Sequence, residues 1–432
     1  MLKSIAAKNV GPIPEFSVKF GPCLNIMTGD NGLGKTFLLD MIWYAMTSFW
    51  PAEVNPRMVS GLMGRPLNPK KDAIIDFTLT GNGSSSKKYQ SKFDRNEQLW
   101  VAQHNLNPQK NELVVYALAD GSLCVWDPAR SYWSASLERS GKYAKYQSAF
   151  VFTPNDIWNG LKQDGNNVCN GLIADLLKWQ DKDSFEYDCM KFLLEELSPA
   201  DFTMRLDEPT RISIDDVRDI PTIRMPYGVV PVLHASSAIR RILSLAYCLT
   251  WAYSEHKKAC DIRGIRPTSQ MTFLMDEVDA HLHPNWQRKI MKALLDSIGE
   301  ILGLRAKGKV QIIASTHSPL VMASLEDVFD ESKDKWLDFD YEKDGTISFT
   351  EREFEKLGTS ESWLKSKAFD LKDSRSIESS EKIRQIYDLL KEERLDKNRI
   401  KLLFNELVEK LSPLDRELFL IRYMCQKKGV LP

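Results

Sequence analysis

Residues 29–36 read GDNGLGKT, a glycine followed by four residues and then Gly-Lys-Thr. The apolar run CLNIMTG leads into this segment, and the apolar run TFLLDMIWYAMTSFW follows it. These runs predict a buried strand and a buried helix, with the glycines in the turn between them. In that context backbone amides and the helix N-terminus bind phosphate, the lysine reaches the terminal phosphates, and the threonine hydroxyl binds Mg²⁺. We therefore predict an ATP-binding loop made of Gly29, Asp30, Asn31, Gly32, Leu33, Gly34, Lys35 and Thr36.

Two more motifs follow predicted strands later in the chain. MTFLMDE ends in Asp276 and Glu277, and His317 follows VQIIAST. Since ligands bind at the carboxyl ends of parallel strands, we expect these side chains beside the phosphates. Asp276 and Thr36 are expected to hold Mg²⁺, while Lys35, Glu277 as general base and His317 at the γ-phosphate are the expected catalytic residues. Taken singly, the acids also fit an exposed loop and the histidine a structural role.

Bulk properties exclude several classes of protein. The 58 lysines and arginines nearly balance the 59 aspartates and glutamates, so no overall positive field indicates a nucleic-acid binder. The seven cysteines form no C-x-x-C pair, which argues against a disulfide framework or a zinc site. Gly11 and Pro12 interrupt the start before a signal-peptide core forms, and no run of about 18 apolar residues occurs. We expect a soluble, cytoplasmic protein.

Strand and helix patterns alternate along the chain and predict an α/β fold. We expect an ATPase domain over residues 1–330, with an antiparallel β insertion at 70–130 and a helical arm at 155–235 that leads to a long helix. A hairpin and linker are expected at 331–378. Residues 379–432 are expected to form amphipathic helices that bind a partner or another copy.

The segments GDNGLGKT, LMDEVDAHLHPNWQRKI and ASTHSPLVMAS together resemble the SMC/Rad50-like branch of the ABC ATPases, specifically the class related to OLD-family ATPases. The resemblance covers most of residues 1–330 and implies an ABC-type ATPase head. It also implies that ATP is sandwiched between two subunits, each capping the other's γ-phosphate with a signature segment. The matching segment here is HASSAIRR, in which Ser236 and Ser237 open a helix suited to phosphate.

This signature segment departs from the family pattern. Ala235 and Ala238 stand where glycine is usual, so slow or regulated hydrolysis is expected. Capping of its own helix is the alternative role for Ser236. The family's glutamine loop has its best candidate in FTPND at 152–156, with Asn155 near the metal, and a helix N-cap is the equal alternative.

No nuclease is expected within this chain. A Toprim nuclease needs a D-x-D pair on a strand, and Asp338 and Asp340 form such a pair. They lie in WLDFDYEKDGTISFTE, which predicts a surface hairpin that turns at Asp344 and Gly345. We therefore expect the effector on another polypeptide.

The segments VCNGLIADLLKW, IPTIRMPYG and WLKSKAFDL look like the ATPases of Septu-type bacterial anti-phage systems. That resemblance implies an oligomeric ATPase, at least a dimer, that controls a separate HNH-type nuclease and reaches DNA through the complex. Two alternatives stay open. One is a repair or recombination ATPase that acts directly on DNA, although no sustained heptads predict coiled-coil arms. The other is a scaffold ATPase with negligible turnover.

Overall fold

The computed structural model describes residues 1–431 apart from 81–84, 104–111, 133–148, 164, 200, 302–309, 343–346, 370, 372, 374 and 393–394. The chain divides into two compact units, Met1–Trp363 and Leu364–Pro432. Across the described residues no helix is long and apolar enough to span a membrane.

An eight-stranded mixed sheet forms the centre of the first unit, in the order β18-β17-β3-β16-β15-β7-β8-β9. Strands β17, β3, β16, β15 and β7 pair in parallel, so their carboxyl ends lie at one edge. The central strands are almost entirely buried and apolar, as is typical of a parallel sheet covered on both faces. The predicted α/β fold is confirmed. The strands are β3 (Leu24–Gly29), β7 (Leu113–Ala117), β8 (Leu123–Trp126), β9 (Ala149–Phe152), β15 (Met271–Met275), β16 (Val310–Ser315), β17 (Lys335–Tyr341) and β18 (Ile347–Arg352).

A second, antiparallel sheet has the order β2-β1-β4-β5-β6. Residues 70–130, expected as one β insertion, supply β4 to β6 to this sheet and β7 and β8 to the mixed sheet. The strands of the second sheet are β1 (Leu2–Val10), β2 (Ile13–Lys19), β4 (Ile74–Thr80), β5 (Ser86–Asp94) and β6 (Leu99–Gln103).

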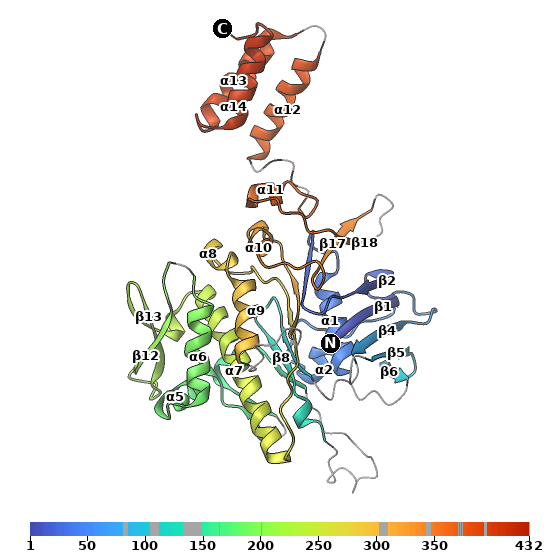
Figure 1. Cartoon of the computed structure of the whole chain (residues 1–432), viewed down its shortest axis with the longest axis vertical. Coiled ribbons are helices and arrows are strands. Elements are labelled where there is room, and N and C mark those ends of the chain that lie inside the picture. The colour runs from blue at the N-terminus through green and yellow to red at the C-terminus, as the bar shows by residue number, and fades with distance from the viewer. Residues whose placement is uncertain are drawn as a thin grey trace. The chain divides into compact units, whose positions relative to one another are not determined.

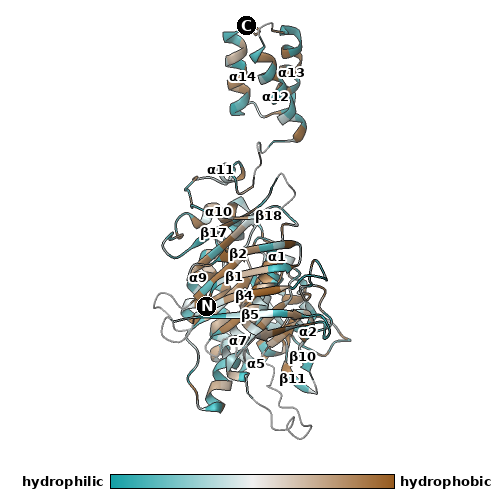
Figure 2. Ribbon diagram, turned by 90° about the vertical axis from the view of Figure 1, so that its right-hand side faces the viewer, coloured by the Kyte–Doolittle hydropathy of each residue, from teal (hydrophilic) through white to brown (hydrophobic). Residues whose placement is uncertain are grey.

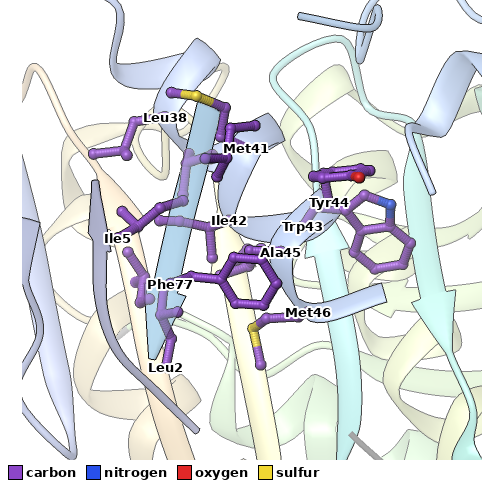
Figure 3. Close-up of a cluster of buried hydrophobic side chains, with 14 of the residues drawn as sticks. Leu2, Ile5, Leu38, Met41, Ile42, Trp43, Tyr44, Ala45, Met46 and Phe77 are labelled. Atoms are coloured by element: carbon purple, nitrogen blue, oxygen red, sulfur yellow. The ribbon is translucent and has the colours of Figure 1, made fainter. Parts of the chain in front are cut away.

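Helix α1 (Lys35–Thr47) packs against strands of both sheets. Every residue from Leu38 to Thr47 is buried, which explains why the sequence is apolar almost all round. Figure 3 shows Leu38, Met41 and Ile42 of this helix gathered with Leu2, Ile5 and Phe77 of the antiparallel sheet. Since each fully buried large apolar side chain contributes roughly 1.5–3 kcal/mol, this cluster fixes the position of the helix. The short helix α2 (Pro51–Val54) follows.

The segment after β9 forms the helical arm and the long helix α7 (Ser237–Arg263). Tyr247 of α7 donates a hydrogen bond to Asp175 of the arm, and Ser254 donates one to Glu186. In Figure 1 the arm and α7 lie on one side of the mixed sheet, and the antiparallel sheet lies on the other. The arm contains α4 (Pro154–Asn159), β10 (Leu161–Gln163), β11 (Asn166–Cys169), α5 (Leu172–Asp181), α6 (Phe185–Glu196), β12 (Arg205–Thr210), β13 (Ile220–Met225) and β14 (Gly228–Pro231).

Beyond β15, the spacing of apolar residues in PNWQRKIMKALLDSIGEIL is that of one continuous helix, but the structure has two. They are α8 (Pro284–Gln287) and α9 (Ile290–Ile301), and the buried indole of Trp286 at their junction donates to the carbonyl of Leu197. This tertiary contact is invisible in the local pattern. Helices α10 (Pro319–Leu325) and α11 (Ser360–Leu364) complete the elements up to the second unit.

Strand β17 corrects one expectation. Asp338 was expected on a surface hairpin. β17 and β18 do pair antiparallel, but β17 also pairs with β3, and Asp338 is only 2% exposed. The carboxylate accepts hydrogen bonds from Thr28 Oγ1 at 2.9 Å and Arg352 Nε at 3.0 Å. Burial raises the pKa of Asp338, and these two donors oppose that shift. Its role is therefore structural; the expected turn at 344–345 lies outside the described residues.

The second unit contains α12 (Ile377–Lys391), α13 (Lys397–Lys410) and α14 (Arg416–Lys427) around a core of its own. In Figure 2 each helix alternates between hydrophobic and hydrophilic residues, as its sequence predicts. Leu414 is an exception: its spacing of four from Leu418 predicts that it lies on the apolar side, but it precedes α14 and is 86% exposed. Arg375 closes the unit through hydrogen bonds of 2.8 Å to each carboxylate oxygen of Asp415. The apolar residues that recur at helical spacing lie in this core, as an amphipathic pattern predicts: Ile383, Ile386, Leu390, Ile400, Leu403, Leu407 and Leu418.

We predict that Asp338→Ala lowers the free energy of unfolding by about 1–3 kcal/mol, because it leaves Thr28 and the partly buried Arg352 without their acceptor. Asp340→Ala, two residues along the same strand, is the control and should change stability by less than about 0.5 kcal/mol. Urea unfolding measures both. Equal stability of Asp338→Ala and the unsubstituted chain would contradict the structural role.

Candidate nucleotide-binding site

The loop between β3 and α1 has the backbone conformation that its glycines permit. The φ angles of Gly29, Gly32 and Gly34 are 119°, 82° and 90°, a range that residues with a side chain rarely adopt. A Cβ atom at Gly29 would lie 2.2 Å from the carbonyl oxygen of Phe339, so neighbouring backbone also requires glycine there. Gly34 opens α1 without a side-chain cap, which leaves the first helical amides available to an anion.

A cavity of about 360 Å³ opens beside this loop at the carboxyl edge of the mixed sheet. It brings together the predicted loop, the paired acids and the predicted histidine. Three expected loop residues are not in its lining: Gly29 and Asp30 contribute carbonyls to Lys35, and Leu33 is buried in the core. The lining residues are Asn31, Gly32, Gly34, Lys35, Thr36, Phe37, Asp40, Asp276, Glu277 and His317.

Asp276 joins two of the elements around the cavity. Its Oδ2 accepts a hydrogen bond of 2.7 Å from Thr36 Oγ1, and its Oδ1 accepts one of 2.7 Å from Ser315. A hydroxyl and a carboxylate placed side by side are oxygen donors of the kind that fits Mg²⁺. Mg²⁺ usually takes its other ligands from water and phosphate, so such a site needs no dense cluster of acids. None of the described residues forms a cluster of three or more metal-binding side chains.

Lys35 is held inside the loop. Its Nζ donates to the carbonyls of Gly29 and Asp30 at 2.8 and 2.7 Å. Burial lowers the pKa of Lys35 to about 8, and the negative charge of Asp276 opposes that shift. Since an anion within reach favours the ammonium form, phosphate bound in the cavity would raise this pKa again.

Glu277 has a strained backbone that its neighbours hold in place. Its φ is 47°, in the left-handed region, which costs roughly 1–2 kcal/mol for a residue other than glycine. The amide of Glu277 donates to Ser315 Oγ at 2.8 Å, and its carbonyl accepts from Arg241 Nη2 at 3.0 Å. The side chain belongs to the cavity lining. The backbone conformation at the expected general base is therefore determined by tertiary packing and not by the local φ/ψ preference of glutamate.

His317 is positioned through its main chain. The amide of His317 donates to Asp279 Oδ1 at 3.0 Å, and Thr316 Oγ1 donates to the same oxygen. Burial, and then the charge of Lys35, lower the pKa of His317. A neutral imidazole near pH 7 has one donor and one acceptor nitrogen, as contact with both a phosphate and a water requires.

The two signature serines lie outside this cavity. Ser236 caps α7 by accepting from the amide of Ile239 at 3.5 Å, as the capping alternative proposed, and both serines are exposed. Ser237 lines a different cavity, together with Arg240 and Arg241. One chain therefore brings Ser236 and Ser237 to a surface and not to its own glycine loop.

The candidate glutamine loop adopts the N-cap that was its alternative. Thr153 caps α4 by accepting from the amide of Asp156 at 3.3 Å. The Asp156 carboxylate is buried and accepts from Arg57 at 2.8 Å. Asn155 is exposed and is not among the residues that line the nucleotide cavity.

The sequence interpretation gave no role to Asp40 and Asp279 near the cavity, and it included Arg241 only as the last residue of the signature segment. Asp40 is 5% exposed and accepts a hydrogen bond of 3.0 Å from Tyr116, and burial raises its pKa to about 8. A spacing of four from Thr36 places Asp40 on the same face of α1, which was a readable signal. Asp279 was readable too, since it comes two residues after the paired acids. The contacts that Arg241 makes near the cavity have no local sequence signal, because they depend on tertiary packing.

The chain is similar to several known proteins. The model of a family described as "AAA domain, putative AbiEii toxin, Type IV TA system" matches residues 24–323. A probable ATPase of retron Vc95 from Vibrio cholerae serotype O1 biovar El Tor is 23% identical over 355 residues, 69% of this chain and 66% of that protein. The Septu protein PtuA of Bacillus mycoides (strain KBAB4) is 32% identical over 92 residues, 21% of this chain and 11% of that protein. This chain therefore spans less than two thirds of either relative.

Among solved structures, the SMC head bound to the C-winged helix domain of ScpA matches with a TM-score of 0.43 and 15% identity, covering 82% of this chain and 98% of that one.

We predict that Asp40→Asn makes stability less dependent on pH. The pKa of Asp40 is about 8 in the fold and 3.8 ordinarily, so between about pH 4 and pH 8 the unfolded chain ionises this group while the folded chain keeps its proton. Stability of the unsubstituted protein therefore falls as pH rises through this window. Asparagine keeps an acceptor for Tyr116 and removes this cost. Urea titrations should show that the free energy of unfolding of Asp40→Asn exceeds that of the unsubstituted chain least near pH 4 and by roughly 1–3 kcal/mol at pH 8. A difference between the two proteins that does not vary with pH would contradict the burial of an ionisable Asp40.

Proposed function

Since the chain belongs to the family described as AAA domain, putative AbiEii toxin, Type IV TA system, and is an ATPase, we propose that it is the ATP-hydrolysing subunit of a bacterial anti-phage defence complex. One observation carries the proposal. The phosphate loop, the paired acids and His317 share one cavity, while Ser236 and Ser237 stand outside it. Each chain thus supplies one half of a nucleotide site from the cavity and the complementary half from α7.

The residues of the cavity divide the chemistry among them. The loop amides and Lys35 bind the β- and γ-phosphates of ATP, and Thr36 and Asp276, the latter through water, would hold Mg²⁺. When bound, Mg²⁺ neutralises charge on the phosphates. Glu277 orients and deprotonates the attacking water, and neutral His317 contacts the γ-phosphate.

A second copy of the chain completes the site. The N-terminus of α7, with Ser236 and Ser237 exposed, presents hydroxyls and a positive helix end of the kind that binds phosphate. Placed over the cavity of another copy, it closes around the γ-phosphate of that copy's ATP. ATP then lies between two subunits, and the active form is at least a dimer.

The effector is a separate nuclease. The two relatives are named for a retron and for a Septu system, which supports a role in defence. Asp338 is committed to Thr28 and Arg352, so the D-x-D pair does not favour a nuclease built into this chain. We assign the docking of an HNH-type nuclease to residues 379–432, where α14 exposes Phe419 and Tyr423 at 55% and 62%. Nucleotide state in the oligomer then controls the nuclease, which is the partner that acts on DNA.

Direct action on DNA by this chain is the second candidate. Lys70, Lys71, Lys87 and Lys88 are all exposed near the antiparallel sheet, which favours a phosphate-binding surface. Binding of duplex DNA to the chain alone that weakens steeply with salt would support this candidate over the separate effector.

We predict that Glu277→Gln lowers kcat for ATP by at least about 100-fold, because the amide does not take the proton of the attacking water. ATP affinity should stay within about threefold, since Glu277 makes no predicted contact with the nucleotide in its ground state. Steady-state turnover and equilibrium binding of ATP measure the two effects. Glu331→Gln, an exposed substitution elsewhere in the chain, is the matched control. Unchanged turnover in Glu277→Gln would favour the scaffold ATPase instead.

A further inference from the structure

Arg241 connects the signature helix to the catalytic edge of the mixed sheet. It lies five residues after Ser236, in the second turn of α7. Its Nη1 donates to the carbonyl of Ala119 at 3.1 Å, and its Nη2 donates to the carbonyls of Asp276 and Glu277 at 3.1 and 3.0 Å. One guanidinium thus joins three carbonyls that follow β7 and β15.

The guanidinium of Arg241 is partly buried but has no ion-pair partner among the described residues. Within the described ranges no carboxylate lies within ion-pair distance of its guanidinium, although several acids surround it. Burial lowers the pKa of Arg241, while the charges of Asp276 and Glu277 oppose the shift. A charge removed from water is costly unless hydrogen bonds satisfy it, and within the described part of the chain Arg241 donates to main-chain carbonyls alone. The backbone held in this way is that of the strained Glu277.

The neighbouring residue, Arg240, makes different contacts from Arg241. Arg240 is exposed, and its guanidinium lies 4.8 Å from the ring centroid of Trp158. It shows no hydrogen bond to the loop that carries Glu277. The connection to the catalytic loop is therefore specific to position 241.

We propose that Arg241 is a positioning residue that couples the signature helix to Glu277 of the same chain, so that engagement of Ser236 and Ser237 on one nucleotide sets the general base for the other. The inference rests on the proposed sandwich of ATP between two copies. In that arrangement the serines of one chain contact the partner's nucleotide, whereas Arg241 acts on the base beside the chain's own nucleotide. The two sites of the pair are thereby linked.

The geometry makes such coupling effective. α7 is a helix of 27 residues with a buried face, so its first two turns move together. Small displacements of a catalytic group, on the order of 1 Å, cost about 100-fold in rate. Hydrogen bonds near 3 Å to both carbonyls that flank the base transmit a shift of α7 to the Glu277 peptide. The planar guanidinium donates in several fixed directions, which the ammonium of lysine does not.

The test replaces Arg241 and compares turnover with binding. Arg241→Met should lower kcat by about 10- to 100-fold, while ATP affinity and ATP-driven association, measured in the Glu277→Gln background, stay within about threefold. Arg241→Lys should recover part of kcat, because lysine donates to carbonyls from one point. Arg263→Met is the matched control: Arg263 is the last residue of the same 27-residue helix, at the opposite end from Arg241, and donates to the carbonyl of Ala129 at 2.7 Å. Its kcat should remain within about twofold of the unsubstituted value.

A double-mutant cycle separates coupling from local support. If Arg241 transmits engagement of the serines, the effects of Ser237→Ala and Arg241→Met on kcat are not additive, and the double variant is little slower than Arg241→Met. Additive effects, or a kcat of Arg241→Met within twofold of the unsubstituted chain, would overturn the inference. An equal loss in Arg263→Met would do the same, because it would show a general role of α7. If Arg241→Met does not fold, Arg241→Lys carries the same cycle. Failure of the sandwich itself would instead appear in the chain without the Arg241 change, as the absence of ATP-driven association.

Discussion

The hydrogen bonds of Asp276 hold the nucleotide site together. Its carboxylate accepts from Thr36 at the start of α1 and from Ser315 at the end of β16, and its amide donates to Ala117 at the end of β7. Its carbonyl accepts from Arg241 of α7. A single residue at the end of β15 thus ties four other elements to one edge of the sheet. Because these elements come from residues 36 to 315, the site exists only when the whole core has folded.

The layers of the first unit explain why this edge is rigid. α1 is enclosed by two sheets, so the loop before it starts from a fixed helix, and the uncapped N-terminus faces the cavity. On the other face, α7 places its serines at the surface and its Arg241 against the catalytic loop. In the proposed function this site supplies a phosphate cradle and a base but no cap of its own. The cap comes from another copy in the proposed function, and Arg241 is the contact through which that copy's nucleotide affects turnover here.

Residues with a local signature were predictable from sequence, and those that depend on distant pairing were not. The glycine loop, the acids and His317 follow strands whose apolar runs are unmistakable, so their meeting at one edge follows from parallel pairing. The antiparallel pairing of β17 with β18 was predicted correctly, but Asp338 was wrongly expected at the surface, because a hairpin has the same local pattern whether or not a third strand pairs with it. Only the pairing of β17 with β3, about 310 residues away in sequence, buries the strand that carries Asp338. The burial of Asp40 and the contacts of Arg241 were not predicted for a related reason, since both depend on which distant segments pack against these side chains.

The central claim is that one chain holds half of each ATP site. The most direct test measures the molar mass by light scattering, with and without ATP and Mg²⁺. Two proteins are compared: the Glu277→Gln variant, and the same variant that also carries Ser236→Arg and Ser237→Arg. The account predicts that ATP at least doubles the mass of the first protein, while the second binds ATP in its cavity and keeps its starting mass. A mass that does not respond to ATP, or the same ATP-driven association in both proteins, would contradict the claim.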